Sequence, residues 1–155
     1  MYIDGEWIGV QRFGTMPVNN PSTGERIGEI PVGGALEAKM AIAAAARAFR
    51  DWSARPAGER SAYLMKLHQL MLAHEEELAS IITQEMGKPL KEARGEVKYA
   101  ASFLEWYAEE AKRVYGDMVP ASHAHKRLMV LQQPVGVVGA ITPWNFPAAM
   151  LTRKL

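Results

Sequence analysis

The sequence contains no cysteine among its 155 residues. This absence excludes a disulfide scaffold, a thiolate zinc site and a cysteine nucleophile within the chain. It is compatible with a reducing compartment, and we expect a cytoplasmic protein. Long apolar runs are also missing, because no stretch reaches the roughly 18 residues that a transmembrane helix needs. The N-terminus carries Asp4 and Glu6 and lacks a basic cluster, which is unlike a secretory signal.

The sequence also lacks an excess of charge of either sign. Lys plus Arg number 18 and Asp plus Glu number 17, which gives a formal net charge of +1. Because so little basic excess is available to neutralise phosphates, we expect no binding to nucleic acid. The composition is 48% hydrophobic and 23% charged, as in an ordinary globular protein of about one domain.

Turn signals and apolar spacing then define the expected elements of the N-terminal part. The pair Asp4-Gly5 between short apolar runs predicts a β-hairpin, and residues 28–32 suit a short strand. Apolar residues spaced at i, i+3, i+4 and i+7 predict helical segments. These segments lie around residues 42–49, 64–71, 78–82 and 97–111. Gly95 costs such a helix about 1 kcal/mol relative to alanine, which predicts close packing of a neighbour against it.

The pattern changes near the end of the sequence. Residues 128–133 alternate in a strand-like way, and residues 134–141 are rich in β-branched side chains between turn signals. The second stretch predicts a buried strand of a parallel sheet. A loop with two prolines follows, and Pro147 suits the first position of a helix. The expected fold class is therefore α/β.

The strand, loop and helix start over residues 134–154 are the best candidate for a functional site. Enzymes with α/β folds present groups to ligands at the carboxyl ends of strands. The side-chain amide of Asn145 is a donor that suits a developing oxyanion, an interaction worth roughly 2.7–4 kcal/mol. From the residues alone, the N-cap of the helix near Pro147 is the more common role for such an asparagine. Trp144 fits a pocket wall or the core, and Arg153 fits a carboxylate site or the solvent-exposed surface.

The four histidines give weaker signals. His123 and His125 lack a suitable third ligand nearby in the sequence, so we expect an exposed loop and no metal site. His68 lies on an apolar helix face, which favours a packed histidine over a catalytic base.

The candidate site at residues 134–154 resembles part of a known enzyme family. The stretch from Pro134 to Pro147 is similar to the first cofactor-domain strand and loop of the NAD(P)-dependent aldehyde dehydrogenases. The similarity extends to the turn at residues 18–25 and the helix end at residues 85–89. The sequence after the loop, Thr152-Arg153-Lys154, is most similar to the succinate-semialdehyde dehydrogenase branch.

The resemblance implies oxidation of an aldehyde to a carboxylic acid with NAD or NADP as cofactor. In the family a cysteine attacks the aldehyde, hydride passes to the nicotinamide, and a glutamate-activated water hydrolyses the thioester. By resemblance, Asn145 helps to hold the thiohemiacetal oxyanion, and Arg153 pairs with the distal carboxylate of the substrate. The cofactor groove would be lined by Ile141, Thr142, Pro143, Trp144 and Asn145.

The resemblance also predicts the organisation of the chain. We expect the N-terminal portion of a Rossmann-type cofactor domain, with the hairpin and helices in residues 1–121. Residues 122–134 would belong to an oligomerisation β-ribbon, and residues 135–155 would hold the first parallel strand, the cofactor loop and a helix start. Such an enzyme acts as a homodimer or homotetramer on a small aldehyde, away from membranes. Since the nucleophile is missing, we expect the chain alone to be inactive; the alternatives are a non-catalytic helical interaction or dimerisation module and a dehydrogenase for another aldehyde.

Overall fold

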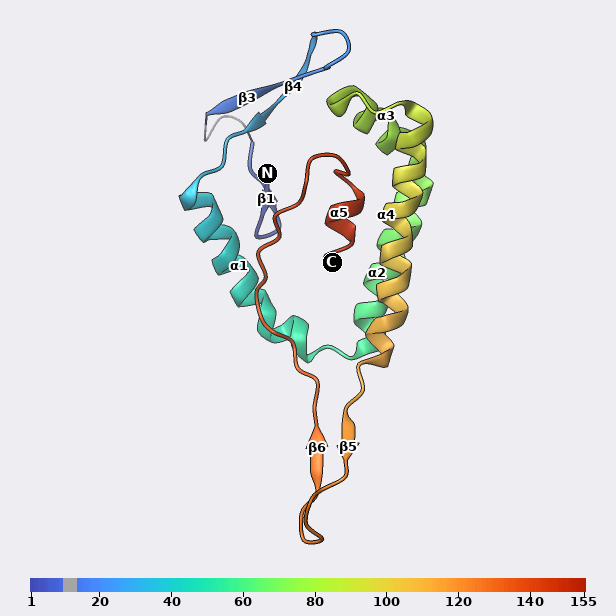
Figure 1. The fold of residues 1–155 in the computed structure, drawn as a ribbon. Coiled ribbons are helices and arrows are strands. Elements are labelled where there is room, and N and C mark those ends of the chain that lie inside the picture. Colours follow the sequence, from blue (N-terminus) through green and yellow to red (C-terminus); the bar gives the residue numbers. More distant parts are fainter. Residues whose placement is uncertain (10–13) are drawn as a thin grey trace.

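Helices and short antiparallel hairpins make up the fold (Figure 1). The computed structural model describes residues 1–9 and 14–155. The helices are α1 (Ala35–Ala54), α2 (Ala57–Ala73), α3 (Glu75–Met86), α4 (Leu90–Glu110) and α5 (Ala149–Thr152), with a 3₁₀ turn η1 (Ala111–Arg113). The strands are β1 (Tyr2–Ile3), β2 (Glu6–Trp7), β3 (Thr15–Asn19), β4 (Arg26–Pro31), β5 (Asp117–Val119) and β6 (Leu128–Val130). They pair antiparallel as β1–β2, β3–β4 and β5–β6.

The N-terminal turns form as the sequence predicts. Asp4 and Gly5 adopt φ values of 56° and 83°, the left-handed pair that a two-residue hairpin turn requires. The predicted strand at residues 28–32 lies largely within β4. Its partner β3 was not predicted, because Pro17 lies within it and proline usually argues against a strand.

The core lies where α2 and α3 pack on α4 (Figure 1). The predicted apolar stripe of α4 is confirmed, since its members are fully buried between residues 97 and 108. Most of these side chains are alanines, which allow the backbones of neighbouring helices to approach closely. Leu104 is the largest fully buried apolar side chain of this stripe.

The prediction for Gly95 is wrong. A Cβ added at this residue would meet no atom of residues 1–9 and 14–155 within 4 Å, so none of these residues packs closely against it. The glycine lies on the exposed side of α4, opposite the buried stripe. Its position therefore costs helix stability without a packing benefit in this chain.

The turn between α3 and α4 has a defined geometry. Gly87 ends α3 with a left-handed φ of 78°, and its N–H donates to the Thr83 carbonyl at 2.9 Å. Pro89 is the N-cap of α4. This tight connection leaves Lys88 beside the first turns of α4, where it becomes important for the site.

The predicted strand over residues 134–141 does not form. The segment runs as irregular chain between β6 and α5 (Figure 1), and Val135 and Ile141 are 94% and 97% exposed. A buried parallel strand needs hydrogen-bonding neighbours on both sides, and the described residues form two-stranded antiparallel pairs only. The helix also begins later than predicted, at Ala149 and not at Pro147.

The strand-like run at residues 128–133 corresponds to β6, which pairs with β5 in a projecting hairpin (Figure 1). The hairpin therefore begins at Asp117, before the expected ribbon segment of residues 122–134. Within residues 1–9 and 14–155, no helix is both long and apolar enough to cross a membrane.

Candidate functional site

A buried ion pair joins the turn before α4 to the body of that helix. Lys88 and Glu96 form the pair, and their side chains are 10% and 0% exposed. The Lys88 ammonium also donates to the Asn145 carbonyl oxygen at 2.9 Å and lies 4.2 Å from the centre of the Phe146 ring. One ammonium thus links α4 to the loop that carries the candidate catalytic asparagine.

The second oxygen of the Glu96 carboxylate holds the start of α5. Its Oε1 accepts hydrogen bonds from the N–H of Ala148 at 2.9 Å and of Ala149 at 3.4 Å. These N–H groups belong to the first turn of the helix and have no helical carbonyl to bind. The carboxylate therefore satisfies them from another helix, and Ala149 itself is buried.

Asn145 does not cap α5, so the capping interpretation is wrong. Ala148 is the N-cap, and no side chain caps it from within the segment. The Asn145 side chain is exposed, and its amide has no hydrogen-bond partner among the residues that the structure describes. Its backbone is held by Lys88 while its side-chain donor stays available for a ligand.

The other predicted cofactor residues precede Asn145 on the same exposed loop. Ile141, Thr142 and Pro143 are exposed, and Trp144 is 71% exposed, so the core alternative for the tryptophan is wrong. Trp144 lines a pocket of about 280 Å³ between the loop and α3. The other lining residues are Leu78, Ile81, Ile82, Glu85, Met86, Pro147 and Ala148.

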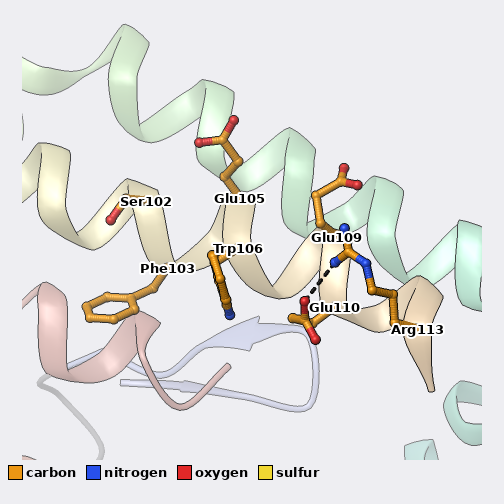
Figure 2. Close-up of a pocket in the computed structure, with 7 residues that line it drawn as sticks. All are labelled: Ser102, Phe103, Glu105, Trp106, Glu109, Glu110 and Arg113. Carbon is orange, nitrogen blue, oxygen red and sulfur yellow. Dashed lines mark hydrogen bonds and ion pairs between the residues drawn. The ribbon is translucent and has the colours of Figure 1, made fainter. Parts of the chain in front are cut away.

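Arg153 follows α5 as its C-cap and is exposed. Its guanidinium carbon lies 5.6 Å from the centre of the Phe103 ring of α4. Phe103 in turn lines a larger pocket of about 630 Å³ along α4 (Figure 2). The contact with the ring restricts the orientation of the guanidinium.

The larger pocket combines an apolar wall with a mostly acidic rim. In Figure 2, Phe103 and Trp106 point to the same side of α4, whereas Glu105 points away from them. Glu110 is paired with Arg113 at 2.7 Å. With Glu105 and Glu109 also on the rim, carboxylates outnumber cations.

The remaining predicted residues have structural roles. His68 is half-buried, and its Nδ1 lies 2.9 Å from the Ala101 carbonyl oxygen, which confirms a packed histidine. His123 and His125 stack in an exposed loop, as expected. In the part of the chain that the structure describes, no cluster of three His, Asp or Glu side chains suits a metal ion.

A surface ion pair between α3 and α4 shows the clearest electrostatic perturbation. Arg94 donates to both carboxylate oxygens of Glu76, at 2.7 and 2.8 Å. This hydrogen bonding lowers the pKa of Glu76 and raises the pKa of Arg94. Both groups lie in solvent, so their pair helps to align the helices without forming a site.

Sequence reasoning missed Lys88 and Glu96, although the sequence contains a signal for the glutamate. Glu96 lies three residues after the buried Ala93 and four before the buried Ala100, so it occupies the apolar face of α4. A carboxylate on such a face requires a partner. The partners of Glu96 lie eight and 52 residues away, and no spacing rule connects them.

Comparisons with known proteins add to this geometry. Residues 7–155 match the aldehyde dehydrogenase family model. The chain is 54% identical over 153 residues to a glutarate-semialdehyde dehydrogenase of Pseudomonas putida, and 57% identical over 153 residues to the mitochondrial succinate-semialdehyde dehydrogenase of Arabidopsis thaliana. Each alignment covers 99% of this chain, but 32% and 29% of those relatives.

A solved structure shows the same arrangement of elements. The crystal structure of an E. coli NADP-dependent enzyme superposes with a TM-score of 0.95 at 52% identity, over 98% of this chain and 32% of that one. The chain thus spans about a third of the length of the relatives that it matches. The α/β class expected from the resemblance is confirmed by this superposition. On the family match and the shared fold, the chain belongs to the aldehyde dehydrogenase family.

Proposed function

We propose that this chain is the N-terminal third of a longer NAD(P)⁺-dependent enzyme, called the complete enzyme below. In our proposal it oxidises succinate semialdehyde, with Asn145 donating its amide N–H to the oxyanion. The observation that carries the proposal is the free Asn145 side chain on a loop whose backbone is fixed by Lys88. A donor held in place before reaction stabilises developing charge more than a mobile one does.

The loop before Asn145 suits one wall of a dinucleotide groove. Ile141 and Trp144 expose large apolar surfaces that the rest of the described chain leaves uncovered. We propose that Ile141, Thr142, Pro143, Trp144 and Asn145 line the nicotinamide and ribose end of the groove. When bound, the dinucleotide supplies the hydride acceptor. Solved relatives are described as NADP-dependent or as complexes with nicotinamide adenine dinucleotide.

Arg153 is the proposed contact for the distal carboxylate of the substrate. A guanidinium binds a carboxylate through two parallel hydrogen bonds, and the stacking on Phe103 limits its rotation. The similar proteins include enzymes named for succinate and glutarate semialdehydes, which both carry such a carboxylate. These names support a semialdehyde substrate.

The substrate assignment is tested by replacing Arg153 with leucine in the complete enzyme. Steady-state rates are measured with succinate semialdehyde and with neutral butanal, and Lys154→Leu is the control for loss of a neighbouring positive charge. We expect Arg153→Leu to raise KM about tenfold or more for the semialdehyde and to leave KM for butanal nearly unchanged. Equal effects on both aldehydes contradict the carboxylate role. Absence of NAD(P)-dependent oxidation of either aldehyde by the folded wild-type enzyme contradicts the proposed function.

We further propose that the β5–β6 hairpin joins subunits in a homodimer or homotetramer. The hairpin projects from the helices, and Met118 and Met129 are both exposed (Figure 1). An apolar two-stranded hairpin with free edges favours pairing with another chain. Sedimentation of the complete enzyme measures the oligomer; a monomer contradicts this assignment. A defined oligomer of residues 1–155, together with an inactive complete enzyme, would instead support a non-catalytic dimerisation module.

A further inference from the structure

The loop that carries Asn145 is held from both sides by one ion pair. On one side, Lys88 donates to the carbonyl of Asn145 itself. On the other, Glu96 accepts from the N–H of Ala148, just past the Phe146-Pro147 step. The two anchoring groups are bonded to each other, so the points they hold share a common support on α4.

The surroundings of Lys88 and Glu96 restrict the motion of both side chains. Glu96 lies on the buried face of α4, with a side chain that is 0% exposed. Lys88 follows Gly87, whose left-handed conformation ends α3, and precedes Pro89, whose ring fixes φ. The ammonium also lies over the Phe146 ring, a favourable cation–π contact that restricts the loop further.

We propose that Lys88 and Glu96 are positioning residues that aim the Asn145 side-chain amide at the reacting oxygen. Neither residue is assigned contact with substrate or cofactor; both act through the backbone of the loop. The inference rests on the proposed role of Asn145. It differs from a purely structural role because it predicts a loss of turnover that depends on the presence of the asparagine amide.

The expected size of the effect follows from the geometry. Glu96→Gln keeps the shape of the side chain and an oxygen that can accept from Ala148, but it removes the charge that holds Lys88. The ammonium then loses its buried partner and the carbonyl of Asn145 is no longer fixed. Misplacement of a catalytic group by about 1 Å can cost about 100-fold in rate, so we expect kcat to fall roughly 10- to 100-fold.

The experiment is a double-mutant cycle in the complete enzyme. Turnover of succinate semialdehyde is measured for the wild type, Glu96→Gln, Asn145→Ala and the double variant. If Glu96 acts through Asn145, Glu96→Gln lowers kcat in the wild-type background and changes it less than about twofold when Asn145 is already alanine. Equal effects in both backgrounds, or none in the wild-type background, overturn the proposal.

A control and a milder variant separate positioning from general destabilisation. Glu76→Gln removes another α4 ion pair that does not contact the loop, and we expect its kcat to stay at the wild-type value. If Glu96→Gln does not fold, Lys88→Arg keeps the charge but replaces a compact ammonium by a planar fork, and we expect kcat to fall roughly three- to tenfold. An unchanged kcat for a folded Lys88→Arg then overturns the proposal.

The outcomes also distinguish this inference from the proposed function. If Asn145→Ala does not lower kcat, the proposed role of Asn145 is wrong, and the positioning role is overturned with it. If Asn145→Ala lowers kcat strongly but Glu96→Gln does not, the catalytic role stands and the positioning role alone is wrong.

Discussion

Replacing Lys88 with methionine should strongly destabilise the chain. The substitution preserves most of the side-chain volume but leaves the Glu96 carboxylate without its cation, and that carboxylate is 0% exposed. Removing one partner of a buried ion pair costs about 3–5 kcal/mol, because the remaining charge is uncompensated. The hydrogen bond to the Asn145 carbonyl and the contact with the Phe146 ring are lost as well.

Urea denaturation followed by circular dichroism at the helical band measures this loss. With an m-value of about 2 kcal/mol per molar urea, the midpoint should fall by roughly 1.5–2.5 M. Lys91→Met is the matched control, since Lys91 is an exposed lysine in the same turn region, and its effect should stay within about 0.5 kcal/mol. Adding Glu96→Gln to Lys88→Met removes the buried charge and should recover part of the lost stability. If Lys88→Met is no more destabilising than Lys91→Met, or if the double variant is less stable than Lys88→Met, then the Lys88–Glu96 pair does not stabilise the chain.

Three further substitutions test other parts of the account. Leu104→Ala should cost about 2–5 kcal/mol in urea denaturation, because this large side chain of α4 is fully buried. A cost below about 1 kcal/mol contradicts its packing in the core. Gly95→Ala should raise the free energy of unfolding by about 0.5–1 kcal/mol, because the added Cβ meets open space in a helix. A lower free energy of unfolding would contradict the open space at this residue. Glu76→Gln should be destabilising near pH 7. The difference in free energy of unfolding between this variant and the wild type should shrink below about pH 4.5, because the Glu76 carboxylate, whose pKa Arg94 lowers, becomes protonated. If the difference is as large at about pH 3 as at pH 7, the ion pair is not its cause.

The sign of that pH dependence follows from the direction of the shift. The pKa of Glu76 is lower in the folded chain than its ordinary value of 4.5. The ion pair therefore adds stability above the ordinary value, and this contribution is lost as the pH falls through the lowered pKa.

Local patterns predicted the parts of the fold that depend on local physics. The turn at Asp4-Gly5 follows from the backbone freedom of those residue types, and the buried stripe of α4 follows from helical spacing. The strand expected over residues 134–141 failed for a different reason. Its β-branched sequence suits a central strand, but strand formation depends on neighbouring strands that the described chain does not provide.

The candidate site shows the same division. The sequence pointed to Asn145 as either a cap or an oxyanion donor; the residue type and position favoured the cap, and the resemblance favoured the donor. The choice depends on Glu96, which lies 52 residues before Ala148 and satisfies the first N–H groups of α5 from another helix. With that task performed elsewhere, the Asn145 amide is left free. A long-range contact of this kind has no signature in the spacing of either segment.

The role of Asn145 as oxyanion donor is measured most directly by the turnover number of Asn145→Ala in the complete enzyme. The variant removes only the proposed oxyanion donor, from a loop whose anchors remain in place. We expect kcat with succinate semialdehyde to fall about 100- to 1000-fold, because the hydrogen-bond donor to the oxyanion is lost. A folded variant whose kcat stays within about threefold of the wild type would contradict the assignment of Asn145.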